Sequence, residues 1–179
     1  NAALNIVAEF DIDIPFVVGL KHMNPCGAAI ASDLKDAWIK TYKADPVSIF
    51  GGIVATNQVI DEECAKLMKY TIPDEGEEKS NLFLELILAP SFTEAAKAEF
   101  SDRKNLRLIE YSLGERQASK QLVSVNGGLL VQDPDIKTKE ITKDMTITKT
   151  QPTDDILSDL SFAWKIVQHV KYNAIVVVK

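Results

Sequence analysis

The stretch that decides the fold is Phe16-Val17-Val18-Gly19-Leu20-Lys21-His22-Met23-Asn24-Pro25-Cys26-Gly27. Its first five residues are a continuous apolar run, which predicts a strand buried on both faces. The run leads directly into Lys21 and His22, and a tight turn is expected at residues 24–27. α/β enzymes present reactive groups where a strand ends at a cleft. His22 is one of only two histidines, so it is the first candidate for proton transfer near neutral pH.

Outward from this stretch, helical and strand patterns alternate along the chain. The pattern predicts helices over residues 2–10, 32–44, 61–70, 93–101 and 153–172, with Ser32, Asp61, Thr93 and Thr153 as N-caps. It predicts strands over residues 16–20, 82–88, 106–111 and 174–178, an edge strand near 145–148 and a glycine-interrupted apolar segment at 48–55. Because the strands are apolar on both faces and helices separate them, we expect a three-layer α/β/α domain with a largely parallel or mixed sheet.

Residues 122–131 leave two readings open. The Asn126-Gly127 pair favours a β-hairpin with a type I′ turn, because both residues tolerate a positive φ. The alternative is a loop at Asn126 that leads into a single strand over residues 128–132.

The composition of the chain argues against some classes of partner and favours a globular domain. The 179 residues are 46% hydrophobic and 26% charged, which is typical of a globular domain. The net charge of -6 argues against a nucleic-acid duplex or an anionic membrane as partner. No signal peptide or membrane-spanning run is visible, and we interpret Cys26 and Cys64 as reduced thiols of a cytoplasmic protein. Because the chain stops directly after the apolar run 174–178, we expect it to be a fragment of a longer polypeptide.

Lys21 and His22 form the leading pair of candidate catalytic residues. Neighbouring side chains on a strand point to opposite faces, so the two can share a site only where the strand gives way to a turn. A nearby ammonium disfavours the imidazolium and helps His22 to accept a proton. The alternative is a histidine at the end of a strand that makes one structural hydrogen bond.

The segment Asn24-Pro25-Cys26-Gly27 comes close to the zinc deaminase pattern without meeting it. That pattern is His-x-Glu followed by Pro-Cys-x-x-Cys. Asn24 stands where the glutamate belongs, and Ala29 stands where the second cysteine belongs. A catalytic zinc needs three protein ligands, so we expect no zinc. Cys26 is interpreted as a packing residue rather than a nucleophile.

Four further positions are weaker candidates. Phe50-Gly51-Gly52 can let a ligand approach bare backbone beside an aromatic face, or it can serve close packing. Glu85 sits within an apolar strand, where a carboxylate needs a partner or a ligand unless that face is exposed. Asn173 follows the long helix and is interpreted either as a site residue or as a C-terminal cap. His169 is interpreted as a surface residue.

Several of these pieces occur together, in the same order, in one family. The matching stretches are Leu20-Lys21-His22-Met23-Asn24-Pro25-Cys26-Gly27, Asp45-Pro46-Val47-Ser48-Ile49-Phe50-Gly51-Gly52-Ile53-Val54-Ala55, Leu84-Glu85-Leu86-Ile87-Leu88-Ala89-Pro90-Ser91-Phe92, Gly127-Gly128-Leu129-Leu130-Val131-Gln132-Asp133, and Phe162-Ala163-Trp164-Lys165 with Lys171-Tyr172-Asn173-Ala174-Ile175-Val176. With these stretches the chain resembles the transformylase region of the bifunctional enzymes that join phosphoribosylaminoimidazolecarboxamide (AICAR) formyltransferase to inosinate (IMP) cyclohydrolase. The resemblance spans nearly the whole chain.

The resemblance implies a cytidine-deaminase-like fold, with residues 1–179 as a single subdomain. It implies formyl transfer from 10-formyltetrahydrofolate to the 5-amino group of AICAR, in purine biosynthesis. Lys21 and His22 match the catalytic Lys-His pair of the family, and Asn173 matches a catalytic asparagine.

The resemblance also implies substrate contacts and partners. Phe50, Gly51 and Glu85 match substrate-contact positions, and Asn24 is expected to join them. The implied partners are AICAR and a reduced folate, within a homodimer whose site lies between two subunits. Because the cyclohydrolase domain and the second half of the transformylase are missing, we expect residues 1–179 alone to be inactive or nearly so.

Two other interpretations stay open. The chain can be a non-catalytic nucleotide-binding module of the same fold, in which Lys21 and His22 are structural. A weaker reading is a relative of the zinc deaminases.

Overall fold

The computed structural model describes residues 1–76, 78–112, 120–135, 139–171 and 173–179. Its centre is a five-stranded sheet with the order β2-β1-β3-β4-β5. The strands are β1 (Phe16–Lys21), β2 (Asn24–Ile30), β3 (Gly52–Thr56), β4 (Leu84–Ala89) and β5 (Arg107–Glu110). β1 is antiparallel to both β2 and β3, whereas β3, β4 and β5 run parallel. The sheet is therefore mixed.

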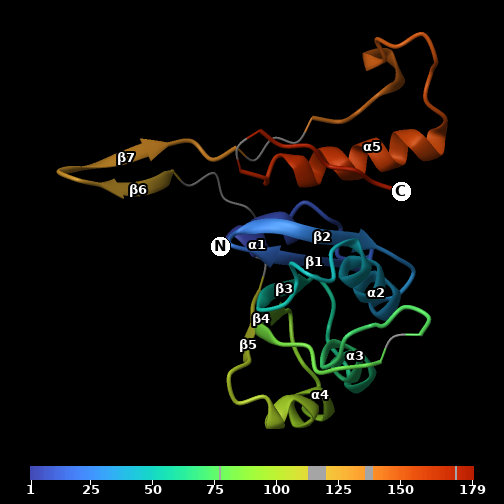
Figure 1. Ribbon diagram of the computed structural model, residues 1–179. Coiled ribbons are helices and arrows are strands. Elements are labelled where there is room, and N and C mark those ends of the chain that lie inside the picture. Colours follow the sequence, from blue (N-terminus) through green and yellow to red (C-terminus); the bar gives the residue numbers. More distant parts are fainter. Residues whose placement is uncertain (77, 113–119, 136–138, 172) are drawn as a thin grey trace.

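Helices cover both faces of this sheet (Figure 1). They are α1 (Ala2–Val7), α2 (Leu34–Ala44), α3 (Glu62–Met68), α4 (Glu94–Glu99) and α5 (Asp154–Val167). Neighbouring strand residues serve opposite layers, because their side chains alternate. Val17 packs in one core with Trp38 of α2, whereas Val18 packs in a second core with Ile6 of α1 and Ile166 of α5. The three-layer α/β architecture expected from the sequence is confirmed.

The helix starts follow the expected caps with one exception. The side chains of Asp61, Thr93 and Thr153 accept hydrogen bonds from the backbone N–H three residues later. At α2 the cap is Asp33, which accepts from the backbone N–H of Asp36, so the prediction of Ser32 was wrong by one residue.

The turn between β1 and β2 differs from the expectation. A turn at residues 24–27 was predicted, but these residues begin β2. The chain reverses instead at His22 and Met23, whose φ values of 50° and 69° are those of a two-residue type I′ hairpin turn. Pro25 is tolerated because β2 is an edge strand, where a missing N–H costs no ladder bond.

The C-terminal part departs most from the predictions. α5 ends at Val167 rather than near residue 172, which itself lies outside the described residues. Residues 174–178 form no strand, and the side chains of Ile175 and Val177 are about nine-tenths exposed. The edge strand expected near residues 145–148 is absent, and a short 3₁₀ helix, η2 (Lys143–Met145), is found there. An apolar run becomes a strand only where another strand edge pairs with it.

Between β5 and η2 the chain forms a separate two-stranded sheet. Its strands are β6 (Gln121–Val125) and β7 (Gly128–Gln132). Because β6 and β7 pair antiparallel, the hairpin is confirmed and the single-strand alternative is wrong. The expected type I′ turn is not found, since Gly127 has a φ of 79° but Asn126 does not have a positive φ. The hairpin projects away from the five-stranded sheet (Figure 1). Among the described residues, no helix is long and apolar enough to cross a lipid bilayer.

Candidate functional site

The candidate residues of β1, β3 and β4 lie at one edge of the five-stranded sheet, the edge at which β1 ends and β3 and β4 begin. Lys21 is the last residue of β1, and the preceding Leu20 pairs with Ile53 of β3. Gly52, the first residue of β3, pairs with Leu84, the first residue of β4. The C-terminal end of β1 therefore lies beside the N-terminal ends of β3 and β4.

Lys21 is held by backbone groups at this edge. Its Nζ donates hydrogen bonds to the carbonyl oxygens of Phe50 at 2.7 Å and Gly51 at 3.2 Å. Gly51 has a φ of 66°, and a Cβ built on it would lie 3.0 Å from the Nζ of Lys21. Glycine therefore serves both the backbone conformation and the approach of the ammonium group. The contact joins the end of β1 to the turn before β3.

An aromatic surface lies next to this ammonium group. The backbone N–H of Gly51 donates to the carbonyl oxygen of Phe83 at 2.8 Å. The rings of Phe50 and Phe83 lie with centroids 5.7 Å apart, and they are 55% and 39% exposed. Exposed aromatic rings beside bare backbone are suited to contact a planar ring of a ligand.

His22 occupies the first position of the hairpin turn and is exposed. Its left-handed backbone conformation costs a residue other than glycine about 1 kcal/mol, and such strain is concentrated at functional sites. Among the described residues, none forms a hydrogen bond with the imidazole. The ring is therefore free to meet a ligand at this edge.

Asn24 connects the hairpin turn to the segment after α5. Its Oδ1 accepts a hydrogen bond at 3.0 Å from the backbone N–H of Lys171, and the Nζ of Lys171 lies 3.5 Å from the Sδ of Met23. Asn173 follows two residues later and is exposed. The hairpin turn and the segment that carries Asn173 are thus joined, although some 150 residues separate them. Asn24, which was expected to contact substrate, thus also has a structural partner.

Glu85 is exposed rather than buried, which agrees with the alternative that this face of the strand is exposed. Gly52 pairs with Leu84 and the next residue, Ile53, pairs with Leu86, so Glu85 is the extra residue of a β-bulge. Bulges redirect side chains near sites. Glu85 directly follows Leu84, the residue of β4 that pairs with Gly52 of β3.

His169 was expected on the surface, and this was wrong. Its side chain is only 16% exposed, and its Nε2 lies 3.3 Å from Oε1 of Glu9, whose side chain is 5% exposed. Glu9 lies two residues after the end of α1, which packs on the same sheet face as α5. This pairing across 160 residues has no local sequence signal.

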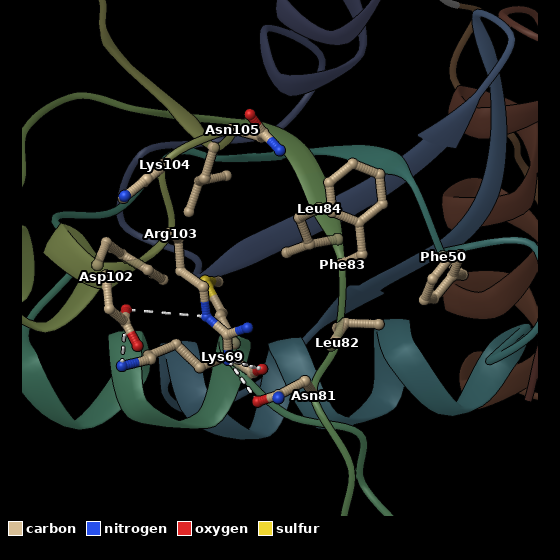
Figure 2. A pocket seen from close by; sticks show the side chains of 13 residues that line it. Phe50, Lys69, Asn81, Leu82, Phe83, Leu84, Asp102, Arg103, Lys104 and Asn105 are labelled. Carbon is tan, nitrogen blue, oxygen red and sulfur yellow. Dashed lines mark hydrogen bonds and ion pairs between the residues drawn. The ribbon is translucent and has the colours of Figure 1, made fainter.

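A pocket of about 490 Å³ begins at the aromatic surface and was missed by sequence reasoning. It runs from Phe50 and Phe83 to Lys69, Arg103 and Lys104 (Figure 2). The cations come from the end of α3 and from the loop after α4, segments that only the fold brings together. No motif could have indicated it.

The two thiols are placed for packing. The Sγ of Cys26 donates to the carbonyl oxygen of Gly19 at 3.4 Å, and burial, with a smaller effect of Asp45, raises the pKa of Cys26 to about 11. Burial likewise raises the pKa of Cys64 to about 12. Among the described residues, no group of three or more His, Cys, Asp or Glu side chains could hold a metal ion.

These pKa values predict slow alkylation. Because thiolate is the reactive form, its fraction at pH 7 is about 10⁻⁴ for Cys26. We expect iodoacetamide to modify Cys26 at least about 100-fold more slowly than a free cysteine, whose pKa is near 8.5. The rate should rise steadily from pH 7 toward pH 10. Mass spectrometry of the alkylated peptide measures it, and modification of folded protein at the free-cysteine rate would contradict the assignment.

The whole chain is similar to known proteins. The model of a family described as AICARFT/IMPCHase bienzyme matches residues 1–179. The chain is 45% identical over 180 residues to the bifunctional purine biosynthesis protein PurH of Anoxybacillus flavithermus and to that of Bacillus cytotoxicus, and 44% identical to that of Bacillus cereus. Each alignment covers 100% of this chain and 33% of the relative. The chain therefore spans about a third of the length of the curated relatives it matches.

Proposed function

The chain belongs to the AICARFT/IMPCHase bienzyme family, and from this we propose that it supplies part of the site that transfers a formyl group from 10-formyltetrahydrofolate to the 5-amino group of AICAR. The observation that supports the proposal most is the joining of the hairpin turn to the segment of Asn173 through Asn24 and Lys171. This bond supports a shared site, because it holds the segment that carries Asn173 at the hairpin turn that follows Lys21.

The chemistry matches these residue types. An arylamine is a weak nucleophile and must lose a proton as its nitrogen attacks the formyl carbon. The exposed imidazole of His22 takes that proton, and the new C–N bond leaves a negative oxygen on the tetrahedral carbon. A lone pair on that oxygen then reforms the carbonyl and the bond to N10 of the folate breaks. The His22 imidazolium returns its proton to N10, which leaves as tetrahydrofolate.

Lys21 and Asn173 stabilise the charge that develops in this step. A fixed donor near the tetrahedral oxygen contributes about 3 kcal/mol to the transition state when the site is dry. The Nζ of Lys21 is held by two carbonyl oxygens, so its position is set before substrate arrives. Phe50, Gly51 and Glu85 then contact the ribonucleotide at the aromatic surface and the bulge.

The wider setting is part of the proposal. Residues 1–179 act as one cytidine-deaminase-like subdomain within a cytoplasmic bienzyme, which works as a homodimer. The alignments support only the part of this proposal that makes residues 1–179 one portion of a bienzyme, because the relatives are about three times as long as this chain.

A non-catalytic nucleotide-binding module is the second candidate. The bonds from the Nζ of Lys21 to two backbone carbonyl oxygens are also those of a structural lysine, and they favour this alternative. The two candidates differ in whether bound folate leads to product.

The test compares binding with turnover. We expect the full-length bienzyme carrying this sequence to form labelled formyl-AICAR from AICAR and 10-formyltetrahydrofolate, and residues 1–179 alone to form none above background. Calorimetric titration with AICAR, with and without folate, measures binding in both proteins. Binding of AICAR by the full-length bienzyme without formyl transfer would favour the second candidate, and turnover by residues 1–179 alone would contradict the proposed incompleteness.

A further inference from the structure

The chain between the end of α5 and Asn173 is short and has little regular structure of its own. α5 ends at Val167, and the backbone N–H groups of His169 and Val170 still donate to carbonyl oxygens of its last turn, at 3.0 and 3.1 Å. Of the described residues beyond Val170, none lies in a helix or a strand. The position of Asn173 therefore depends on individual side-chain contacts of this segment.

One such contact is the bond between Asn24 and the backbone of Lys171. It fixes the segment at a single point, two residues before Asn173. Because two residues of chain span at most about 7 Å, this point limits how far Asn173 can lie from the hairpin turn. A single hydrogen bond does not set the direction in which the chain leaves it. A second contact is needed to fix that direction.

The second contact lies two residues before Lys171. The Nε2 of His169 lies 3.3 Å from Oε1 of Glu9. An ionised carboxylate can only accept a hydrogen bond, so the imidazole donates from Nε2. The side-chain nitrogen of Gln168 lies 3.4 Å from the same ring nitrogen, but Gln168 belongs to the same segment and cannot tie it to another element.

Glu9 connects this segment to a well-packed part of the fold. Its side chain is 5% exposed, and a buried carboxylate is costly without a donor, which favours the contact with His169. The next residue, Phe10, stacks on Phe16 of β1 with ring centroids 3.8 Å apart, and its centroid lies 5.4 Å from that of Phe162 of α5. Glu9 is thus held by the packing that joins α1, β1 and α5.

We infer that His169 and Glu9 position Asn173 for formyl transfer. The inference rests on the proposed function, in which Asn173 stabilises the charge of the transition state. The contact at residue 169 ties the segment to the chain after α1, and the contact at residue 171 ties it to the hairpin turn. Together they set the direction in which the chain reaches Asn173. In this role neither side chain touches the substrate, and both are positioning residues.

The first experiment removes the contact and keeps most of the bulk of the ring. In the full-length bienzyme we expect His169→Leu to lower kcat about tenfold and to change the KM for AICAR and for 10-formyltetrahydrofolate less than about twofold, because a misplaced group costs turnover rather than binding. His169→Gln keeps an N–H that can reach Glu9 and should recover most of kcat. An unchanged kcat in His169→Leu would overturn the inference.

A double variant separates position from stability. His169→Leu leaves the carboxylate of Glu9 without this donor and should lower the Tm. Adding Glu9→Gln removes the buried charge and should recover most of the Tm, yet kcat should stay about tenfold low because the contact is still missing. Recovery of kcat together with the Tm would make the pair structural only. If His169→Leu alone did not fold, this double variant would carry the same test.

The control for stability is Ile166→Val. Ile166 is a buried residue of α5 that packs on the same sheet face as α1. Its loss of one methyl group should lower the Tm slightly and leave kcat unchanged. A loss of kcat in this variant equal to that in His169→Leu would assign the effect to the docking of α5 and would contradict the inference.

A further double variant tests whether His169 acts through Asn173. In an Asn173→Ala background no carboxamide remains to be positioned, so adding His169→Leu should lower kcat by less than about a further twofold. A further loss of about tenfold would place the effect of His169 elsewhere and would contradict the inference.

Hydrogen exchange separates this inference from the proposed function. In His169→Leu the backbone amide of Lys171 should exchange about tenfold faster than in the parent protein, whereas the amides of β3 should not change. If exchange rises in this way while the parent shows no formyl transfer, the proposed function fails and the anchoring of the segment stands. If formyl transfer is found and neither exchange nor kcat responds to His169→Leu, the positioning pair fails alone.

Discussion

Replacing His22 by alanine is expected to lower the kcat of formyl transfer in the full-length bienzyme by about 10²–10⁴-fold, the usual contribution of a general base. His22 lies at the exposed turn of the β1–β2 hairpin, and no described residue forms a hydrogen bond with its imidazole. Its loss should therefore change the free energy of unfolding by less than about 0.5 kcal/mol. Steady-state kinetics and thermal denaturation measure the two effects.

A second variant separates the loss of the imidazole from a change in the backbone conformation of the turn. Because His22 has a φ of 50°, alanine leaves the turn in a conformation that it adopts reluctantly, whereas asparagine tolerates it. His22→Asn should keep the turn and lose the activity equally. If either variant retained kcat within about threefold of the parent, general-base catalysis by His22 would be wrong.

Replacing Asn173 by alanine is expected to lower kcat by about 10²–10³-fold, the usual effect of removing one donor to a developing oxyanion. The exposed side chain contributes little to folding, so the Tm should stay within a few degrees. Since the loss concerns the transition state, the KM for AICAR should change much less than kcat.

Variants of Asn24 test whether the position of the segment that carries Asn173 matters for activity. Asn24→Leu removes the acceptor that holds the backbone N–H of Lys171 at 3.0 Å, and we expect a smaller loss in kcat, about tenfold. Asn24→Asp keeps an acceptor oxygen and should recover most of the activity. An Asn173→Ala variant with full kcat would remove Asn173 from the catalytic group, whatever Asn24 does.

Short sequence patterns predicted those elements that depend on residues close together in the sequence. Asp61, Thr93 and Thr153 cap helices because each cap bond spans three residues, and the sequence displays such pairs directly. The strand at residues 16–20 was recognisable because it is apolar on both faces. Residues 24–27 were misjudged because Asn-Pro and Cys-Gly indicate a turn in isolation. Only the edge position of β2 makes proline acceptable there.

The remaining errors come from contacts that no local pattern contains. The apolar run at residues 174–178 has the composition of a strand, yet it pairs with no strand edge in the structure. His169 pairs with Glu9, and Asn24 pairs with Lys171, each across more than 140 residues. Lys21 and His22 could be singled out from the sequence, whereas the pocket at Arg103 could not, because four separate segments form it.

The most direct measurement is the rescue of a His22→Gly variant by free imidazole. Glycine accepts the positive φ at this position and leaves the space of the lost ring open. If an imidazole at the hairpin turn removes the proton of the amine, added imidazole should raise the formyl-transfer rate of the variant by about tenfold or more. The rise should follow the concentration of the unprotonated base and be absent in the parent protein. A variant that is inactive and unaffected by imidazole at every pH, yet folded and able to bind AICAR, would contradict proton transfer by His22.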